Sequence, residues 1–325
     1  MKLLFGRAIP VVAVISMLSA CSGLQGQGME PRAGFRARVL TSHGVKSRSW
    51  MLPEARAEDL IYVVGGCGGS CVLSYPKGKL VGTIEGYHGV FSAACSDAIG
   101  NVFISNNAAV VEFAHAGTTP IATFSLPGDN AEGCSVDRTT GSLAVVFGIT
   151  EVAIFTPSSG APAIYNSTLE ANYCGYDDAG NLFVDGSNGQ APGLAELPKG
   201  GQTFLKLSIS QSVGVAGQVQ WDGSHITYES GGRSNNNKIS QLQISGSMAT
   251  VVGTTSLQGI RRNALQSWIY EGTVVVPYGN HGPYAKNVGI WQYPNGGRPT
   301  RRITKFGNFS KKTIGFFGAT VSVAR

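Results

Sequence analysis

Short apolar runs separated by glycine-containing turns fill the chain from about residue 59 onward. In a typical unit, at 174–185, an apolar run is followed by an Asp, a Gly-Asn pair and a second apolar run. Similar units lie at 95–104 and 134–145. No long stretch repeats apolar residues at the helical period, so the pattern predicts strands joined by tight turns. Recurrence at roughly 40 residues indicates repeated structural units.

Two kinds of turn alternate along these repeats, one rich in Pro and Gly and one built on an acidic residue. An Asp in such a turn can accept hydrogen bonds from the amides that follow it. The acidic positions are Asp97, Asp137, Asp177, Asp222 and Glu271, with Ser322 in the sixth place. Each repeat then supplies four strands, which in one repeat are expected at about 91–97, 101–105, 109–114 and 120–125. Four strands per repeat, arranged radially, predict a β-propeller.

The two ends of the repeat region complement each other. The region begins at 60–64, which matches a second strand, and ends at 317–322, which matches a first strand with no second strand after it. Pairing these two segments closes a ring and removes exposed strand edges. The predicted fold is therefore all-β: a six-bladed β-propeller over 59–325, with four-stranded blades and one blade shared by both ends. A seven-bladed ring that also uses the preceding residues is the alternative.

The repeats resemble a known kind of propeller. The turn Asp97-Ala98-Ile99-Gly100-Asn101, followed by an apolar strand, resembles the six-bladed NHL-type propellers. From about Ser49 to the C-terminus the chain is similar to uncharacterised bacterial predicted lipoproteins. That similarity rests on 49–53, 74–83 with its Tyr-Pro-Lys-Gly turn, 133–137 with its Cys-x-x-Asp unit, 219–223 and 317–322. The resemblance implies a fold and no activity, because that group has none assigned.

The N-terminus has the pattern of an export signal. Lys2 and Arg7 precede an apolar stretch that is too short to span a bilayer as a helix. The stretch ends in Leu18-Ser19-Ala20-Cys21, which resembles a bacterial lipobox. Residues 1–20 are thus expected to be a lipoprotein signal peptide, with lipid attached to Cys21. Ser22 after the cysteine resembles the sorting pattern for the outer membrane, where one is present.

Residues 21–58 are predicted to be a flexible tether. Gly, Gln, Ser and Arg dominate and no apolar period occurs, so the segment cannot bury enough surface to order itself. Between Pro31 and Trp50 several basic residues occur without any acidic one. Such a segment is either a solvated spacer or a contact with anionic headgroups or cell-wall polymer near the anchor. The protein is expected to be extracytoplasmic and bound to a membrane through its lipid.

The best candidate site is a ring of positions five residues before the acidic turns. In NHL-like propellers the innermost strand begins at one mouth of the central channel, and these positions are expected there. They are Ser92, Glu132, Asn172, Gly217, Gln266 and Phe317. Glu132, Asn172, Gln266 and Ser92, together with His88 in a nearby loop, are predicted to line a ligand-binding mouth. A hydrated channel lining without a ligand is the alternative for the same residues.

An enzymatic function is the second hypothesis. Propeller lactonases of the gluconolactonase type hold calcium at this mouth, and similarity to them implies Glu132 and Asn172 as ligands and His88 as base. Calcium prefers six to eight oxygens, and Gly217 and Phe317 offer none. The chain also lacks His-Glu-x-x-His and a Gly-x-Ser-x-Gly elbow. A binding or scaffolding module without a cofactor is therefore favoured, and no catalytic residue is assigned.

The cysteines suit an oxidising compartment. With Cys21 lipidated, five remain, and Cys67 and Cys71 are predicted to form a disulfide across a small loop. Cys95, Cys134 and Cys174 are expected to be small buried residues. Cys95 lies two residues before its Asp and the others three, so its side chain is expected on the opposite face. A site that holds a metal with all three is therefore disfavoured.

Basic residues dominate the charge, with a formal net charge of +6. Arg301, Arg302 and Lys305 lie in a C-terminal run without acidic residues, and Arg261 and Arg262 occupy the equivalent loop one repeat earlier. Such a sector attracts anions, so an anionic glycan, a cell-wall polymer or a protein is a candidate partner, and a solvated face is the alternative. Nucleic acid is not expected, because no motif for it occurs.

Overall fold

The computed structural model describes residues 49–87, 93–189, 191–231, 237–260, 262–279, 285–309 and 315–325. All of them belong to one unit, Phe35–Arg325, and a second unit comprises Met1–Gly34. The predicted signal peptide, Cys21 and most of the tether lie outside the described residues. The described part of the chain contains no helix with the length and apolar composition that a membrane crossing requires.

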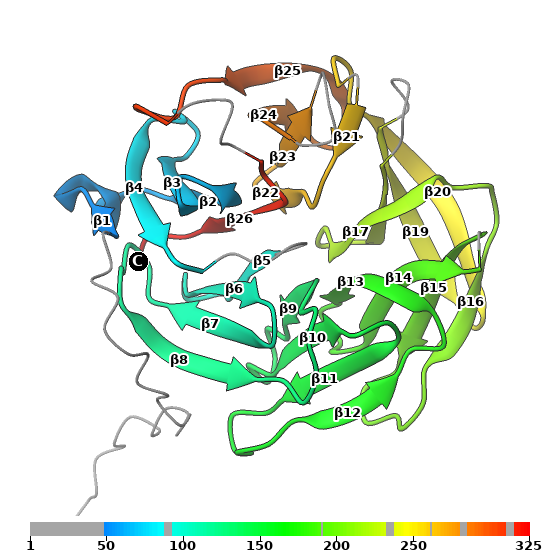
Figure 1. Cartoon of the computed structure of the whole chain (residues 1–325). Helices are drawn as coiled ribbons and strands as arrows, with labels where there is room; N and C mark the ends of the chain where they lie inside the picture. The colour runs from blue at the N-terminus through cyan, green and yellow to red at the C-terminus, as the bar shows by residue number, and fades with distance from the viewer. Residues whose placement is uncertain are drawn as a thin grey trace, which may run out of the picture. The chain divides into compact units, whose positions relative to one another are not determined.

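The described strands form five mainly antiparallel sheets, in which most neighbouring strands are consecutive in the chain (Figure 1). Two sheets have four strands each. One contains β5 (Ala94–Ser96), β6 (Val102–Asn106), β7 (Ala109–Phe113) and β8 (Pro120–Ser125). The other contains β9 (Cys134–Val136), β10 (Leu143–Phe147), β11 (Glu151–Phe155) and β12 (Ala163–Asn166). A third sheet contains β21 (Arg262–Ala264), β22 (Trp268–Tyr270), β23 (Thr273–Gly279), β24 (Asn287–Gln292) and β25 (Gly296–Ile303).

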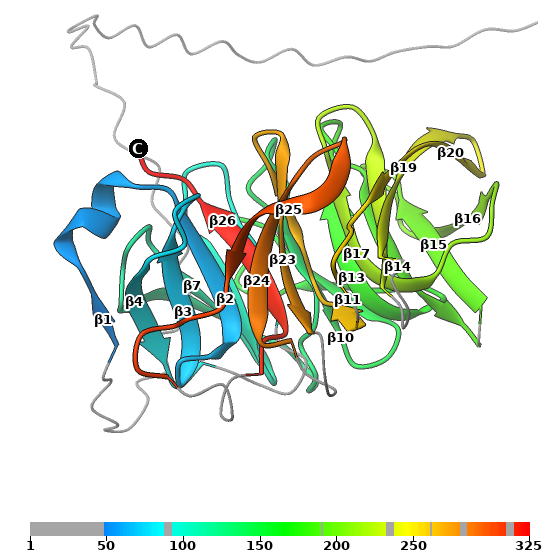
Figure 2. The ribbon, with the colours of Figure 1, turned by 90° about the horizontal axis from the view of Figure 1, so that it is seen from above.

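The largest sheet joins two runs of consecutive strands. The first run is β13 (Glu170–Tyr176), β14 (Leu182–Asn188), β15 (Ala191–Leu197) and β16 (Leu205–Ile209). The second is β17 (Val215–Trp221), β18 (Ile226–Gly231), β19 (Lys238–Ser245) and β20 (Met248–Ser256). The outer strands β16 and β20 pair in parallel through Ser208 and Ile209, which makes one sheet of eight strands. The sheets surround a centre where β5, β9, β13, β17, β22 and β26 lie innermost, so the fold is all-β and propeller-like (Figures 1 and 2).

The last sheet joins the two ends of the ring, in the order β1 (Trp50–Met51), β4 (Leu80–Glu85), β3 (Gly69–Ser74), β2 (Leu60–Gly66) and β26 (Gly318–Ser322). β26 pairs antiparallel with β2, Leu60 opposite Ser322 and Ile61 opposite Val321. The predicted pairing of the two ends of the repeat region is therefore confirmed.

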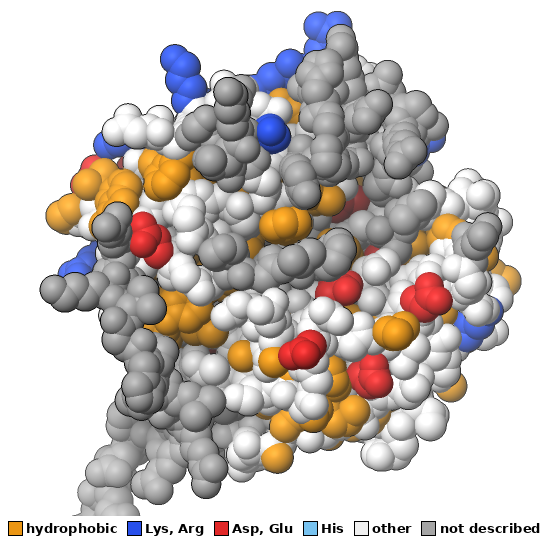
Figure 3. Space-filling view, in the orientation of Figure 1, with side chains coloured by type: hydrophobic (Ala, Val, Ile, Leu, Met, Phe, Trp, Pro, Cys, Tyr) orange, Lys and Arg blue, Asp and Glu red, His pale blue; other side chains and the backbone are white. Residues whose placement is uncertain are grey.

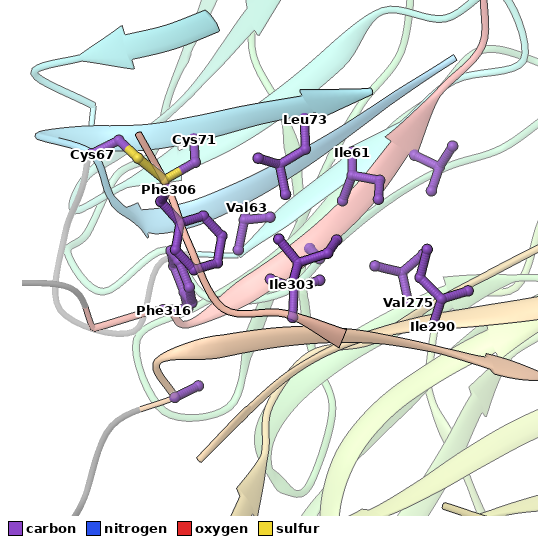
Figure 4. Packing of buried hydrophobic residues seen from close by; sticks show 14 residues of the cluster. Ile61, Val63, Cys67, Cys71, Leu73, Val275, Ile290, Ile303, Phe306 and Phe316 are labelled. Atoms are coloured by element: carbon purple, nitrogen blue, oxygen red, sulfur yellow. A yellow bond between two sulfur atoms is a disulfide. The ribbon is translucent and has the colours of Figure 1, made fainter. Parts of the chain in front are cut away.

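The core lies between neighbouring sheets. In Figure 4, Ile61, Val63 and Leu73 of β2 and β3 pack against Val275 and Ile290 of β23 and β24. Similar clusters fill the spaces between the other neighbours. Since alternate side chains point to opposite faces, a strand in this arrangement is buried on both sides. This accounts for the continuous apolar runs in the sequence, as in β10, where all five residues are buried.

The acidic turns behave as predicted at most positions. The Asp97 carboxylate accepts the amides of Ile99 and Asn101 at 3.0 and 2.8 Å. Asp177 accepts the equivalent amides of its own turn at the same distances. Glu271 differs, because it lies in a short hairpin with a φ of 44° and is exposed. The carboxylates of Asp97 and Asp177 thus fix the corner between the first two strands of their repeats.

The folded body begins earlier than residue 59. Trp50 and Met51 pair with Thr83 and Gly82 of β4. The short helix η1 (Pro53–Ala57) follows and buries Ala55 completely. The part of the predicted tether from Trp50 onward is therefore packed on the outer strand of the closing sheet. Met51 and Leu52 pack against the core cluster that contains Leu60, Val72 and Val81.

Disulfides join Cys67 to Cys71 and Cys95 to Cys134, and Cys174 is free and buried. The first bond is the one selected from sequence. The second was not predicted, since the sequence pattern left the pairing of Cys95, Cys134 and Cys174 open. Cys95 of β5 and Cys134 of β9 belong to one buried cluster with Phe103 and Val145, so each side chain lies on the face that its sheet turns to the other. Since the sheets are neighbours, those two faces meet.

Removing the Cys95–Cys134 disulfide should cost more stability than removing Cys67–Cys71. The closed loops span 39 and 4 residues, which correspond to about 4 and about 2 kcal/mol of unfolding free energy. The comparison is between the two double Cys→Ala variants, measured by urea denaturation of the oxidised chain. Equal losses, or a larger loss for Cys67–Cys71, would contradict this expectation.

Candidate binding site at the channel mouth

The innermost strands leave a narrow channel, with a cavity of about 30 Å³ lined by residues such as Ser135, Gly175, Gln220 and Trp268. Gly175 is required there, because a Cβ atom would lie 2.6 Å from the Val219 carbonyl oxygen of the next inner strand. The end of this channel where β9, β13 and β17 begin is called the channel mouth. The opposite end carries the acidic turns.

Two of the predicted mouth residues lie together. The amide of Glu132 donates to the Val146 carbonyl, and the next amide, of Gly133, donates to the Asn172 carbonyl at 3.0 Å. Asn172 lies at a bulge in β13. Glu132 is half-buried, and burial raises the pKa of its carboxyl to about 7. Ser92 and His88 lie outside the described residues.

Gln266 is also near the channel, but its polar atoms are already bonded. Its Oε1 accepts the amide of Ala94 at 2.9 Å, and its Nε2 donates to the carbonyl of the same residue at 2.7 Å. Its own carbonyl accepts the amide of Ala319. Gln266 is completely buried and links its own segment to β5 and β26. In this structure it holds inner strands together.

Two further carboxylates, which the repeat pattern does not single out, complete the mouth. Asp185 at 0% exposure and Glu229 at 1% occupy corresponding positions in the second strands β14 and β18. Asp185 Oδ1 accepts the Tyr173 amide at 2.9 Å, and Glu229 Oε2 accepts the Ser267 amide at 3.3 Å. The other oxygen of each carboxylate has no partner among the described residues. In the sequence, Asp185 directly follows Val184 and Glu229 directly follows Tyr228. An acidic residue inside an otherwise apolar strand was therefore the signal by which these two could have been found.

The mouth cluster is the group of five residues Glu132, Tyr173, Asp185, Gln218 and Glu229. Gln218 lies opposite Glu229 in the β17–β18 pair, and its Oε1 also has no described partner. The bulged Gly217 provides space for Glu229, since a Cβ there would lie 3.2 Å from Glu229 Cγ. Burial raises the pKa of Tyr173, and the charges of Asp185, Glu132 and Glu229 raise it further. Tyr173 is also the pairing partner of Asp185 between β13 and β14.

The cluster holds more negative charge than its surroundings favour. Burial raises the pKa of Glu229 to about 7. Burial also raises that of Asp185 well above its ordinary value, and the charges of Glu229 and Glu132 add to this effect. Carboxylate side chains gather on this face over β9 to β14, whereas Lys and Arg side chains lie toward its edges (Figure 3). The mouth is therefore a site of acceptor oxygens and incomplete charge compensation.

The described residues do not form a metal centre. No three His, Cys, Asp or Glu side chains among them are close enough together to hold a metal ion. Glu132 and Asn172 would supply at most two side-chain ligands to calcium, which prefers six to eight oxygens. No step of a metal-dependent hydrolysis is therefore derived from these residues.

The predicted basic residues lie away from the mouth cluster. Arg301 and Arg302 are exposed on β25, and Lys305 is exposed just after it. None of the ion pairs between described residues involves these three. Arg261 lies outside the described residues, and Arg262 belongs to β21 without a described side chain. Binding of an anion there stays a prediction.

Comparison with known proteins supports the fold alone. No protein-family model matches the chain, and no curated protein matches its sequence. A protein of unknown function from Bacteroides caccae is similar in structure, with a TM-score of 0.57 and 12% identity over 82% of this chain and 99% of its own. The β-propeller domain of Cps50 (Swd1) from Myceliophteria thermophila has a TM-score of 0.53 and 9% identity over 78% and 85%. The chain has a propeller-like fold.

Glu229→Gln should stabilise the protein more at about pH 8 than at about pH 5. The pKa of Glu229 is about 7 when folded against an ordinary 4.5. The folded state therefore binds this proton more tightly, and wild-type stability falls as the pH rises from 4.5 through 7, by on the order of 3 kcal/mol. The glutamine side chain does not titrate, so the variant does not lose stability in this way as the pH rises. Thermal midpoints of both proteins across this range test the expectation.

Glu151→Gln is the control for this measurement. Amides of Thr150 and Ile149 lower the pKa of Glu151, so its replacement should give no gain that grows with pH. A difference between Glu229→Gln and wild type that is the same at both pH values would contradict the assignment of Glu229.

Proposed function

We propose that the protein is a lipid-anchored, extracytoplasmic binding module, a six-bladed NHL-type propeller that holds a ligand with a cationic amino group in the mouth cluster. Six inner strands, β5, β9, β13, β17, β22 and β26, support the blade number. The eight-stranded sheet then counts as two blades, β13–β16 and β17–β20, joined by their outer strands. The Asp-based turns at Asp97 and Asp177 support the NHL-type resemblance.

The observation that carries the proposed ligand is the set of unpaired acceptors at the mouth. Asp185 Oδ2, Gln218 Oε1 and Glu229 Oε1 are buried and have no hydrogen-bond partner among the described residues. A buried acceptor without a donor costs about 1–3 kcal/mol, and more when it is charged. A primary ammonium group carries three donors and no acceptor. Its three donors therefore equal these acceptors in number, and its positive charge is opposite to that of an ionised Asp185 or Glu229.

An amine also fits the surroundings better than a bare metal ion. Metal ligation needs several oxygens around one point, which the described carboxylates do not provide. An ammonium group on an organic ligand has only three donors to satisfy, whereas calcium prefers six to eight oxygens around it. Bound positive charge would lower the raised pKa values of Glu132 and Glu229 and so release protons.

The N-terminal sequence supports the location. The basic start, the short apolar stretch and Leu18-Ser19-Ala20-Cys21 fit a lipoprotein signal, and the disulfide Cys95–Cys134 fits an oxidising compartment. Residues 21 to 49 would connect the lipid to the propeller. Exposed Arg301, Arg302 and Lys305 are suited to an anionic glycan or cell-wall polymer as a partner.

Binding of amines should depend on the mouth cluster. We expect the full-length protein in detergent to bind spermidine and the peptide Lys-Gly-Gly, with proton release in calorimetry near neutral pH. Glu229→Gln and Asp185→Asn should each weaken binding at least tenfold, because each removes charge at the unpaired acceptors. Glu151→Gln, which removes a charge elsewhere, should weaken it by less than twofold.

Calcium chloride and a neutral analogue, acetylated Lys-Gly-Gly, complete this experiment. Binding of calcium with loss in Glu132→Gln would favour the hydrolase hypothesis in place of the amine. Equal binding of the acetylated peptide would exclude the mouth cluster as an amine site. Undiminished amine binding by a Glu229→Gln protein whose thermal midpoint is at least that of the wild type would exclude it as well.

Cys21→Ser should release the protein from the membrane. Without the cysteine sulfur no diacylglycerol can be attached, and two or more acyl chains are what hold a protein stably. In a bacterial host, labelled palmitate should enter the wild type and not the variant, and the variant should leave the membrane fraction. Cys174→Ser, a cysteine that is buried in the propeller, is the control. Label in Cys21→Ser would exclude this anchor.

A further inference from the structure

A second concave site lies at the end of the ring opposite the mouth cluster. β17 runs from Val215 at the channel mouth to Trp221 at this other end. There a cleft of about 570 Å³ opens between the second half of the eight-stranded sheet and the sheet of β22–β25. Its lining includes Arg138, Trp221, Asp222, His225, Tyr270 and Tyr293. The volume lies within the range of about 300–1,000 Å³ that is usual for small-molecule sites.

The floor of this cleft is fixed by one carboxylate. Asp222 Oδ1 accepts the amides of Ser224 and His225 at 2.9 and 2.7 Å. Its Oδ2 accepts the Tyr293 hydroxyl at 2.5 Å and the Gln241 amide nitrogen at 3.0 Å. Burial opposes ionisation, but these bonds hold the pKa of Asp222 below its ordinary value. The two sheets that border the cleft are thus joined, and the cleft is formed before a ligand arrives.

Aromatic side chains contribute to the apolar surface of the cleft. Trp221 is half-buried: it packs against the core cluster around Phe183 and Tyr228 and also lines the cleft. Tyr270 is held by its hydroxyl, which donates to Asp59 Oδ2 at 2.9 Å, and by an edge contact with Tyr75. Rings that are held in place in this way offer flat surfaces with little loss of conformational freedom on binding.

The polar groups of the cleft balance one another. Arg138 and Glu271 are both exposed and carry opposite charges, and the Asp222 carboxylate is already fully bonded. The exposed charges of the lining, one of each sign, therefore select neither an anion nor a cation. Aromatic surfaces bordered by hydrogen-bonding groups of both kinds suit a ligand with apolar faces and a hydroxyl rim.

We propose that this cleft binds a neutral oligosaccharide, with Trp221 as the stacking surface and Arg138 and Glu271 bonding to sugar hydroxyls. Apolar C–H faces of a sugar ring would lie on the aromatic rings, and the hydroxyls around it would meet the charged rim. This site is separate from the mouth cluster in position and in ligand chemistry. It stands whether or not the mouth binds an amine.

The test uses the full-length protein in a detergent without a sugar headgroup. The probes are maltotetraose, cellotetraose and chitotetraose, with binding followed by calorimetry and tryptophan fluorescence. We expect at least one of them to bind with a Kd of about 1 mM or tighter. Trp221→Phe should weaken that binding at least fivefold and remove the fluorescence change, and Arg138→Ala should weaken it at least threefold.

Two matched variants identify the site. Trp50→Phe changes an exposed tryptophan of β1 and should bind as the wild type does. Glu229→Gln in the mouth cluster should also leave sugar binding unchanged, which separates this proposal from the proposed function. Binding by none of the three sugars at about 10 mM would overturn the proposal. Full binding by Trp221→Phe and Arg138→Ala together, both with wild-type thermal midpoints, would overturn it as well.

Discussion

The pairing of β26 with β2 is the interaction on which the rest of the structure depends. Each sheet is apolar on both faces and must be covered on both, so an open row of sheets would leave two apolar faces in water. The pairing of Ile61 with Val321 puts the last strand inside the first sheet and leaves no such ends. Side chains strengthen this closure: Ser96 Oγ donates to the Val321 carbonyl, and the His115 ring bonds to Ser322 Oγ.

The features that could be predicted from the sequence are the local turns and strands and the pairing of the two ends. Turns and strands are local features, and β6, β7 and β8 lie within a few residues of the segments expected from the apolar runs. Pairing of the ends also followed, because one missing strand and one surplus strand are visible in the sequence. The Cys95–Cys134 bond did not follow. It depends on two faces of neighbouring sheets turning toward each other, which alternation within a single strand does not reveal.

The candidate site was partly predictable for the same reason. Glu132 could be found from its distance to an acidic turn, since that distance sets its position along the inner strand. Asp185 and Glu229 come to the mouth from second strands, beside bulges at Asn172 and Gly217 that shift the register. Bulges depend on the packing of the whole ring. Gln266 was expected among the ligand-binding groups, but its amide bonds to Ala94 across the inner strands.

The carboxylates at the two ends of β17 differ in how completely their oxygens are bonded. At the cleft, Asp222 accepts four hydrogen bonds, and its carboxylate stabilises the fold as well as shaping the floor. At the mouth, Glu229 leaves one buried oxygen without a described partner, at a cost to stability. Buried polar atoms without a hydrogen-bond partner are expected mainly at functional sites. A rigid ring can tolerate that cost, because its stability comes from apolar packing between sheets and not from the mouth.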